Sequence, residues 1–365
     1  MATISLCMIV KDEEAVLARC LDSVRGVAEQ TVIVDTGSAD RTREIAAAYG
    51  EVFCFPWCDD FSAARNFSFA QAAQEYILWL DADDVVEPAD RERLLAVKAQ
   101  LDGTADVVML PYHTAFDEQG APCFTYYRER LIRRGAGLRW QGAVHECIPP
   151  QGRIVYGDAA VTHRKAKPSD RRRNLRIYEG LLARGQQLDA RGCFYYAREL
   201  QTDGQYARAV QAFEEFLARP DGWVENRIQA CRDLSACLTA LGQRAAAKES
   251  LVRSFAYDRP RAETCCALAA LELEDGLPEQ AAFWYRIALD APCAPQDGAF
   301  VHAPCYGYVP CLGLCVCCDR MGRYAQAAAW NERAALYQPS SAAVAYNRRY
   351  FAERRAAVSE AAAGA

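Results

Sequence analysis

Short apolar runs alternate with amphipathic segments in the N-terminal half of the chain. Each run is short enough for a buried strand, and the segments between them repeat their apolar residues with helical spacing, as at Val16, Cys20 and Val24. Such alternation predicts a mostly parallel sheet covered by helices on both faces, an α/β fold. The predicted strands are 4–10, 31–34, 52–55 and 76–80, and the predicted helices are 40–49, 62–73, 88–100 and a segment that begins at Asp12.

The pattern changes after the last of these helices. A strand is predicted at 106–110, and aromatic and charged residues then alternate over 124–132, which is typical of a half-exposed antiparallel strand. Short strands at 154–156 and 160–163 complete a domain that we place at residues 1–168.

The rest of the chain predicts helices only. A linker helix is expected over 169–190, and four units over 191–341 share a turn glycine, a small residue where two helices touch and a closing proline. At about 34 residues a unit, this pattern resembles tetratricopeptide repeats. The longer last interval fits an insertion around 293–304, and 342–365 is predicted as a capping helix and tail. The glycines are Gly204, Gly242, Gly276 and Gly322, the small residues Ala209, Ala245 to Ala247, Ala281 and Ala327, and the prolines Pro220, Pro260, Pro292 and Pro339.

Composition narrows the class of protein. Hydrophobic and charged contents of 52% and 25% over 365 residues are typical of a globular protein with two domains. No apolar run reaches the roughly 18 residues of a membrane span, and residues 1–10 lack the features of a signal peptide. The net charge of −6 disfavours nucleic-acid binding, and 17 cysteines without an export signal favour a reducing cytoplasm. Four clustered cysteines match no zinc spacing and are predicted to be buried small side chains: Cys311, Cys315, Cys317 and Cys318.

Three carboxylates, Asp81, Asp83 and Asp84, follow the apolar run 76–80, where strands of open α/β sheets end and ligands bind. Like charges about 4 Å apart repel by about 1 kcal/mol in water and about 4 kcal/mol at an effective dielectric constant of 20. A divalent cation among them relieves this repulsion, and Mg²⁺ or Mn²⁺ held by one or two carboxylates plus phosphates fits the pattern. The alternative is that the acids cap the helix that starts near Pro88.

Four blocks of the first domain resemble family 2 glycosyltransferases of the GT-A type, in order and spacing as well as in composition. They are residues 5–14 (SLCMIVKDEE), 34–42 (VDTGSADRT), 64–66 (ARN) and 80–83 (LDAD). With its repeats, the chain resembles the bacterial branch that fuses this domain to tetratricopeptide repeats, which includes the sublancin-type peptide S-glycosyltransferases. The resemblance implies a GT-A, Rossmann-like fold and inverting transfer of a sugar, a hexose in the first instance, from a UDP-linked or similar donor with Mg²⁺ or Mn²⁺.

The resemblance also assigns a nucleoside site. It places Glu13 and Asp35 against the nucleoside, and Gly37 lets the backbone come close. The alternative for Asp35 is an ordinary strand–turn–helix cap, and Asp40 is predicted to be the N-cap of the second helix.

The metal site implied by the resemblance is the D-x-D motif. Asp81 would face the ribose or the metal, and Asp83 would ligate the metal that bridges the diphosphate. His163, which ends the last predicted strand, would complete the site, although most lone strand histidines are only hydrogen-bonded. Asp84 would support this site or cap the next helix.

Arg65 and Asn66 lie at a loop–helix boundary and are predicted donor contacts. An arginine there could hold a phosphate with two hydrogen bonds. The alternative is a salt bridge from Arg65 to Asp59 or Asp60.

His145 and Glu146 are the candidates on the acceptor side. An inverting transfer needs a carboxylate or imidazole that takes the proton of the nucleophile. We favour Glu146 as the base, with His145 orienting it or binding sugar, and the reverse assignment and a surface turn without chemistry stay open. Trp57 and Trp140 are candidate sugar platforms, with core packing as the default.

The leading hypothesis is a cytoplasmic glycosyltransferase whose repeats supply an acceptor groove, for a peptide or protein, or a homodimer surface. The alternative is a repeat-based adaptor whose first domain binds nucleotide without turnover. A nucleotidyltransferase is disfavoured because residues 11–14 (KDEE) stand where its glycine- and lysine-rich loop would follow the first strand.

Overall fold

The computed structural model describes residues 2–117, 120–164, 170–293 and 300–363. The chain divides into two compact units, one that runs from Met1 to Asp203 and one that begins at Gly204. Among the described residues, no helix combines the length and apolarity that crossing a bilayer requires.

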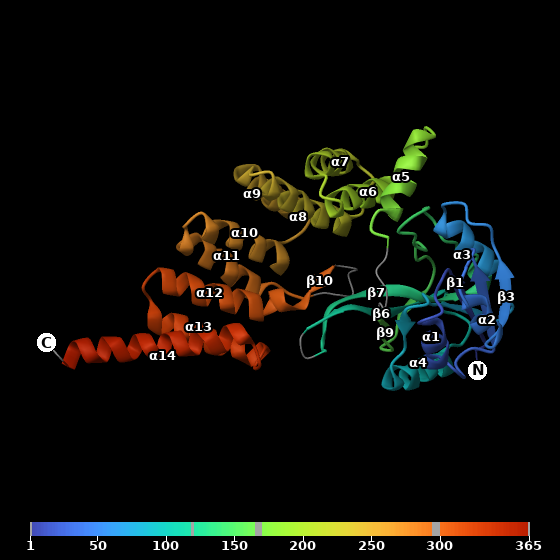
Figure 1. Cartoon of the computed structure of the whole chain (residues 1–365), viewed down its shortest axis with the longest axis horizontal. Coiled ribbons are helices and arrows are strands. Elements are labelled where there is room, and N and C mark those ends of the chain that lie inside the picture. The colour runs from blue at the N-terminus through green and yellow to red at the C-terminus, as the bar shows by residue number, and fades with distance from the viewer. Residues whose placement is uncertain (1, 118–119, 165–169, 294–299, 364–365) are drawn as a thin grey trace. The chain divides into compact units, whose positions relative to one another are not determined.

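The first unit is built around one twisted sheet (Figure 1). Its strands follow the order β3-β2-β1-β4-β7-β6-β9-β5, with β8 also beside β6. The pairs β1–β2, β2–β3 and β1–β4 are parallel, whereas β7 runs antiparallel to both β4 and β6. The mostly parallel α/β prediction is therefore confirmed. The strands are β1 (Ile4–Val10), β2 (Gln30–Asp35), β3 (Glu51–Cys54), β4 (Tyr76–Trp79), β5 (Asp84–Val85), β6 (Val107–Phe116), β7 (Pro122–Arg133), β8 (Ile154–Tyr156) and β9 (Val161–His163).

Helices cover both faces of the sheet, as the alternation of the sequence predicts. Leu17 and Leu21 of α1, Ala46 of α2 and Leu94 of α4 belong to the larger core on one face. On the other face α3 packs through Phe67 and its neighbours against a smaller core. The helices of this unit are α1 (Leu17–Ser23), α2 (Thr42–Ala47), α3 (Phe61–Ala70), α4 (Pro88–Gln100), α5 (Arg173–Ala183) and α6 (Ala190–Thr202), with the 3-10 turn η1 (Arg134–Ala136).

Two details of the strands differ from the prediction. The exposed alternation expected over 124–132 stops at Glu129, because Glu129 and Arg130 are both buried, at 5% and 0% exposed. In addition, Asp84 lies in β5 instead of capping α4, whose N-cap is Glu87 with Pro88 at the first helical position. A two-residue strand has too short an apolar pattern to be seen in a sequence.

The second unit consists of paired helices, and Figure 1 shows the successive pairs α8–α9, α10–α11 and α12–α13 lying antiparallel. The four turn glycines stand between helices with φ between 73° and 77°, a conformation that strains residues with a side chain. The alanine five residues after each glycine, Ala209, Ala247, Ala281 or Ala327, is 0% exposed, which confirms the predicted small contact residues. The elements are α7 (Tyr206–Ala218), α8 (Val224–Ala240), α9 (Arg244–Arg253), η2 (Ser254–Ala256), α10 (Ala262–Glu274), α11 (Pro278–Asp290), β10 (Val301–His302), η4 (Ala303–Tyr306), α12 (Tyr308–Arg320), α13 (Tyr324–Tyr337) and α14 (Ala342–Ala363).

The clustered cysteines lie inside this unit. Cys311, Cys315, Cys317 and Cys318 are each at most 1% exposed and belong to its apolar clusters. The prediction of buried small side chains is confirmed.

Gly313 lets α12 pack closely against α11. A Cβ at this position would lie 2.3 Å from the ring of Tyr285, so Gly313→Ala forces the two helices or the ring to move. We expect this substitution to lower the free energy of unfolding by about 1–3 kcal/mol, measured by chemical denaturation.

The matched control is Gly180→Ala in the interior of α5. The nearest atom to its new Cβ is the flexible Arg184 Nη1 at 3.5 Å, so the usual helix preference for alanine should stabilise the protein by about 0.5–1 kcal/mol. Changes of the same sign in the two variants would contradict the close approach at Gly313.

Candidate active site

The acidic turn after β4 meets the last strand of the sheet. Strand β5 pairs antiparallel with β9 so that Asp84 lies directly opposite His163. The backbone N–H of Arg164 donates to the carbonyl of Asp83 over 2.8 Å, which closes the turn against β9. Strand pairing thus brings together residues that are far apart in the sequence.

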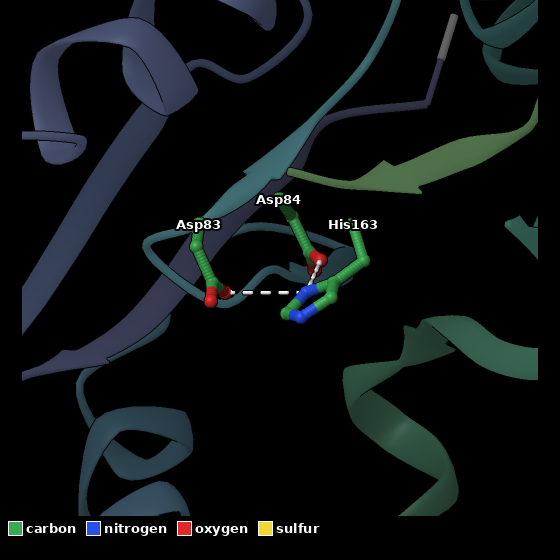
Figure 2. A group of neighbouring side chains, drawn as sticks. All are labelled: Asp83, Asp84 and His163. Carbon is green, nitrogen blue, oxygen red and sulfur yellow. Dashed lines mark ion pairs between the residues drawn. The ribbon is translucent and has the colours of Figure 1, made fainter. Parts of the chain in front are cut away.

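Asp83, Asp84 and His163 form one cluster, and each offers a ligand atom within 4.8 Å of the others. Figure 2 shows the His163 ring facing both carboxylates, with Nδ1 at 3.5 Å from Asp83 Oδ1 and 3.7 Å from Asp84 Oδ1. The side chains of Asp83 and His163 are 29% and 27% exposed, whereas that of Asp84 is fully buried. Within this cluster, a ligand from solvent can therefore reach Asp83 and His163 but not Asp84.

Asp84 is already committed to protein partners. Its Oδ2 accepts from Arg130 Nη1 over 2.9 Å and from the backbone N–H of Asp81, and its Oδ1 accepts from the Tyr112 hydroxyl over 2.8 Å. Asp84 thus supports the turn and the His163 ring, and it is not the helix cap that its position before Pro88 suggested.

The electrostatic environment differs between the two exposed members of the cluster. Burial, together with the charges of Asp81 and Asp84, raises the pKa of Asp83 although the nearby His163 opposes the shift. The hydrogen bond with Asp84 raises the pKa of His163, against the effect of burial. Repulsion among the acids is therefore only partly neutralised by the protein, which favours a cation at this edge.

Asp81 points to a different partner. Burial alone would raise its pKa, but the charges of Arg65 and Arg130 outweigh burial and lower the pKa of Asp81 to about 2. Arg65 Nη2 donates to Asp81 Oδ1 over 2.6 Å. Asp81 is consequently held as a carboxylate beside the cluster of Asp83 and His163.

Arg65 joins the D-x-D motif to the His-Glu element. Its Nε donates to Glu146 Oε1 over 2.6 Å, while its guanidinium lies 5.1 Å and 4.6 Å from the ring centroids of Trp79 and Trp140. These contacts hold Arg65, which is 7% exposed, in one place. No pattern in the sequence indicated that Asp81 and Glu146 share a partner.

The alternative salt bridge of Arg65 is not formed. Asp60 instead caps α3 by accepting from the backbone N–H of Ala63, and Asp59 accepts from Trp57 Nε1. Asn66 exchanges two hydrogen bonds of 3.0 Å with the backbone of Trp140. Its role in donor binding stays a prediction.

The two tryptophans differ in exposure. Trp140 is 2% exposed and packs edge-on against Trp79, so it is a core residue and not a sugar platform. Trp57 is half-buried and stacks edge-on with Phe61. Only Trp57 is open to a ligand.

His145 and Glu146 lie in a tight turn closed by the bridge between Gln141 and Cys147. His145 has a φ of 51°, a strained conformation for a residue with a side chain. Its Nε2 lies 2.6 Å from Glu199 Oε1 of α6. The sequence-based prediction did not include Glu199, because the helical pattern around this residue does not indicate which acidic side chain faces the His-Glu turn.

The predicted nucleoside residues lie at the carboxyl edge of β1 and β2. Asp35 is 2% exposed and accepts from the backbone N–H groups of Gly37 and Ser38, so it shapes the turn as its capping alternative proposed. Gly37 has a φ of 107°, which requires glycine. The backbone N–H of Glu13 donates to Thr42 over 2.6 Å, so the loops after β1 and β2 are tied together.

A parallel sheet that gathers acids at its carboxyl edge, followed by helical repeats, matches the GT-A-like architecture with a repeat region that the sequence predicts. Residues 5–151 match the family model described as Glycosyl transferase family 2. The chain belongs to glycosyl transferase family 2. A relative named as a TPR repeat-containing protein supports the assignment of this chain to the branch that carries tetratricopeptide repeats.

Three relatives illustrate the family. The TPR repeat-containing protein Synpcc7942_0270 of Synechococcus elongatus is 32% identical over 300 residues, which cover 80% of this chain and 67% of that protein. The prophage-derived glycosyltransferase SunS of Bacillus subtilis is 28% identical over 214 residues, 54% of this chain and 49% of SunS. The lipopolysaccharide core biosynthesis glycosyltransferase LpsC of Rhizobium meliloti is 32% identical over 161 residues, 41% of this chain and 58% of LpsC. The chain thus spans about two thirds of the first relative and about half of the second.

Proposed function

We propose that this chain is a metal-dependent, inverting glycosyltransferase that transfers a sugar from a nucleoside-diphosphate donor. The preferred sugar is a hexose, and the preferred donor is UDP-linked. The observation that carries the proposal is the approach of Asp83 and His163 to 3.5 Å beside Asp81, at the sheet edge of a family 2 domain. Free cysteines throughout the described chain are consistent with a reducing, cytoplasmic setting.

The residues fit a divalent cation. Asp83 offers an oxygen and His163 a nitrogen, both partly exposed, and the buried Asp84 holds the His163 ring in place. A site with so few protein ligands leaves positions for diphosphate oxygens and water, as Mg²⁺ and Mn²⁺ prefer. When bound, the cation would act as a Lewis acid that stabilises the charge of the departing diphosphate.

The other residues divide between donor and acceptor. Asp35, Gly37 and Glu13 form the nucleoside end at the edge of β1 and β2. Arg65 fixes the Asp81 carboxylate on the donor side, and it also holds Glu146 on the acceptor side. The His-Glu turn supplies the base that accepts the proton of the nucleophile.

The acceptor is proposed from the repeats. Paired helices with small contact residues build surfaces suited to extended peptides, so a peptide or protein is the preferred acceptor, and a second copy of the chain is a further partner. LpsC is named for lipopolysaccharide core biosynthesis, which makes a saccharide acceptor the alternative to test.

The test is release of nucleoside diphosphate from a panel of sugar nucleotides with Mn²⁺. We expect turnover of at least one UDP-linked donor, loss of that turnover in EDTA and recovery when Mn²⁺ is added in excess, because His163 offsets only part of the acidic charge around Asp83. Turnover that persists in EDTA would exclude metal dependence. Absence of both turnover and donor binding across the panel would exclude the transferase itself, and donor binding without turnover would favour the adaptor.

A further inference from the structure

His145 is held from three sides by helix α6. Glu199 Oε1 lies 2.6 Å from its Nε2, the Tyr195 ring stacks on its ring at 4.1 Å and 13°, and Arg191 Nε donates to its backbone carbonyl over 2.9 Å. The ring of His145 is both stacked and hydrogen-bonded, and its backbone has a strained φ. Contacts with α6, and not the turn that carries His145, therefore set the position of this side chain.

The Glu199 carboxylate is also held in place by its surroundings, which favour its ionised form. Its side chain is 11% exposed, and Asn174 Nδ2 donates to the same oxygen over 3.0 Å. Burial would raise its pKa, but the hydrogen bonds from His145 and Asn174 outweigh burial and lower the pKa of Glu199. An ionised carboxylate can only accept a hydrogen bond, so Glu199 takes the Nε2–H of His145, and in the neutral imidazole the lone pair is then on Nδ1.

Nδ1 is the other ring nitrogen of His145. The described residues place no hydrogen-bond partner on this atom, and the side chain is 31% exposed. The neighbouring Glu146 is in the opposite situation, with a side chain that is 11% exposed and bound to the Arg65 guanidinium at 2.6 Å. The Oε1 atom of Glu146 is therefore already occupied by Arg65, and an acceptor hydroxyl or thiol would have to compete with that contact.

We infer that His145 is the base of the transfer and that Glu199 of α6 is the residue that positions it. This inference rests on the proposed glycosyltransferase function and chooses between the two members of the His-Glu pair. Glu146 then serves, through Arg65, to fix Asp81.

In the proposed sugar transfer, each bond, electron pair and proton is accounted for. The acceptor oxygen or sulfur forms a bond to the anomeric carbon while the bond from that carbon to the diphosphate oxygen breaks, and the electron pair leaves with the diphosphate. The acceptor proton moves to His145 Nδ1, and Glu199 stabilises the resulting imidazolium through Nε2–H.

Azide provides a test that needs no knowledge of the acceptor. With water as acceptor, the proton must be removed, whereas azide is an anion that attacks without losing a proton. We expect His145→Ala to lower the kcat of Mn²⁺-dependent donor hydrolysis about a hundredfold with the KM for the donor unchanged. Sodium azide should then return nucleoside-diphosphate release to the level of wild type with azide and yield the glycosyl azide.

Glu199→Gln tests the positioning role with a side chain of the same shape. We expect its hydrolytic kcat to fall about tenfold to a hundredfold, with azide rescue, and Glu199→Asp to recover part of the loss. The matched control is Glu332→Gln, which removes the exposed ion pair between Glu332 of α13 and Arg348 of α14 and should leave kcat unchanged.

The outcomes separate the inference from the function on which it rests. If wild type turns over donor and Asp83→Ala does not, but both His145→Ala and Glu199→Gln hydrolyse like wild type, only the inference is overturned. A loss in these variants that azide does not rescue would also overturn it, since a base is then not what was removed. An azide-rescued loss in Glu146→Gln alone would assign the base to Glu146.

Discussion

We expect Asp83→Ala to lower the proposed metal-dependent release of nucleoside diphosphate by about a thousandfold or more. A metal contributes several kcal/mol to stabilising the departing charge, and about 1.4 kcal/mol corresponds to each factor of ten in rate. Asp83 is the carboxylate of the acidic turn that solvent reaches and that Arg65 and Arg130 do not occupy. Removing it leaves His163 as the one exposed ligand of the three-residue cluster.

Two measurements check this expectation. Calorimetry should show that the Mn²⁺-dependent binding of nucleoside diphosphate to wild type is lost in Asp83→Ala. Asp22→Ala is the matched control, because Asp22 is an exposed acid paired with Arg25 on α1, and it should bind and turn over donor like wild type. Wild-type affinity and rate in Asp83→Ala would remove the metal site from this turn.

The parts of the fold that the sequence predicts well are those with a local signal. A turn glycine and a buried alanine five residues later repeat around Gly204 and Gly276, and each meets a steric demand that few residues can satisfy. The apolar run of β1 likewise matches the observed Ile4–Val10 at both ends. Such features depend on residues within one or two turns of chain.

The contacts that complete the site have no such signal. Arg65 reaches Asp81 across 16 residues and Glu146 across 81, and His145 meets Glu199 across 54. Which arginine or acid fills such a position depends on how the sheet and helices pack, and the sequence offers many candidates of each kind. The alternative considered for Arg65, a salt bridge to Asp59 or Asp60, was wrong for this reason, since nearness in sequence was its only support.

Asp84 shows how one residue of a motif can have an unexpected role. In the run 81–84 it looks equivalent to its neighbours, but the pairing of β5 with β9 turns its side chain inward. There it meets Arg130, and both side chains are 0% exposed. The exposed alternation predicted over 124–132 ended at this point because a buried acid needs a buried partner.

Arg130→Met should lower the free energy of unfolding by about 3–5 kcal/mol, because it leaves the Asp84 carboxylate buried without its cation. The Arg130 guanidinium also lies 3.9 Å from the Trp79 ring centroid and 4.3 Å from that of Tyr112, so methionine fills most of the same space. Chemical denaturation monitored by tryptophan fluorescence measures the change in the free energy of unfolding, since Trp79 lies in this unit.

The double variant Asp84→Asn with Arg130→Met identifies the cause of the stability loss in Arg130→Met. If the cost comes from an uncompensated charge, neutralising Asp84 recovers a large part of it, and the two substitutions are strongly non-additive. Arg25→Met, which breaks the exposed pair with Asp22, should cost less than about 1 kcal/mol. An Arg130→Met variant as mildly affected as Arg25→Met would mean that water or a rearranged side chain compensates Asp84. The acidic turn would then owe its shape to the hydrogen bonds of Asp84 with Tyr112 and the Asp81 backbone, and not to the buried ion pair.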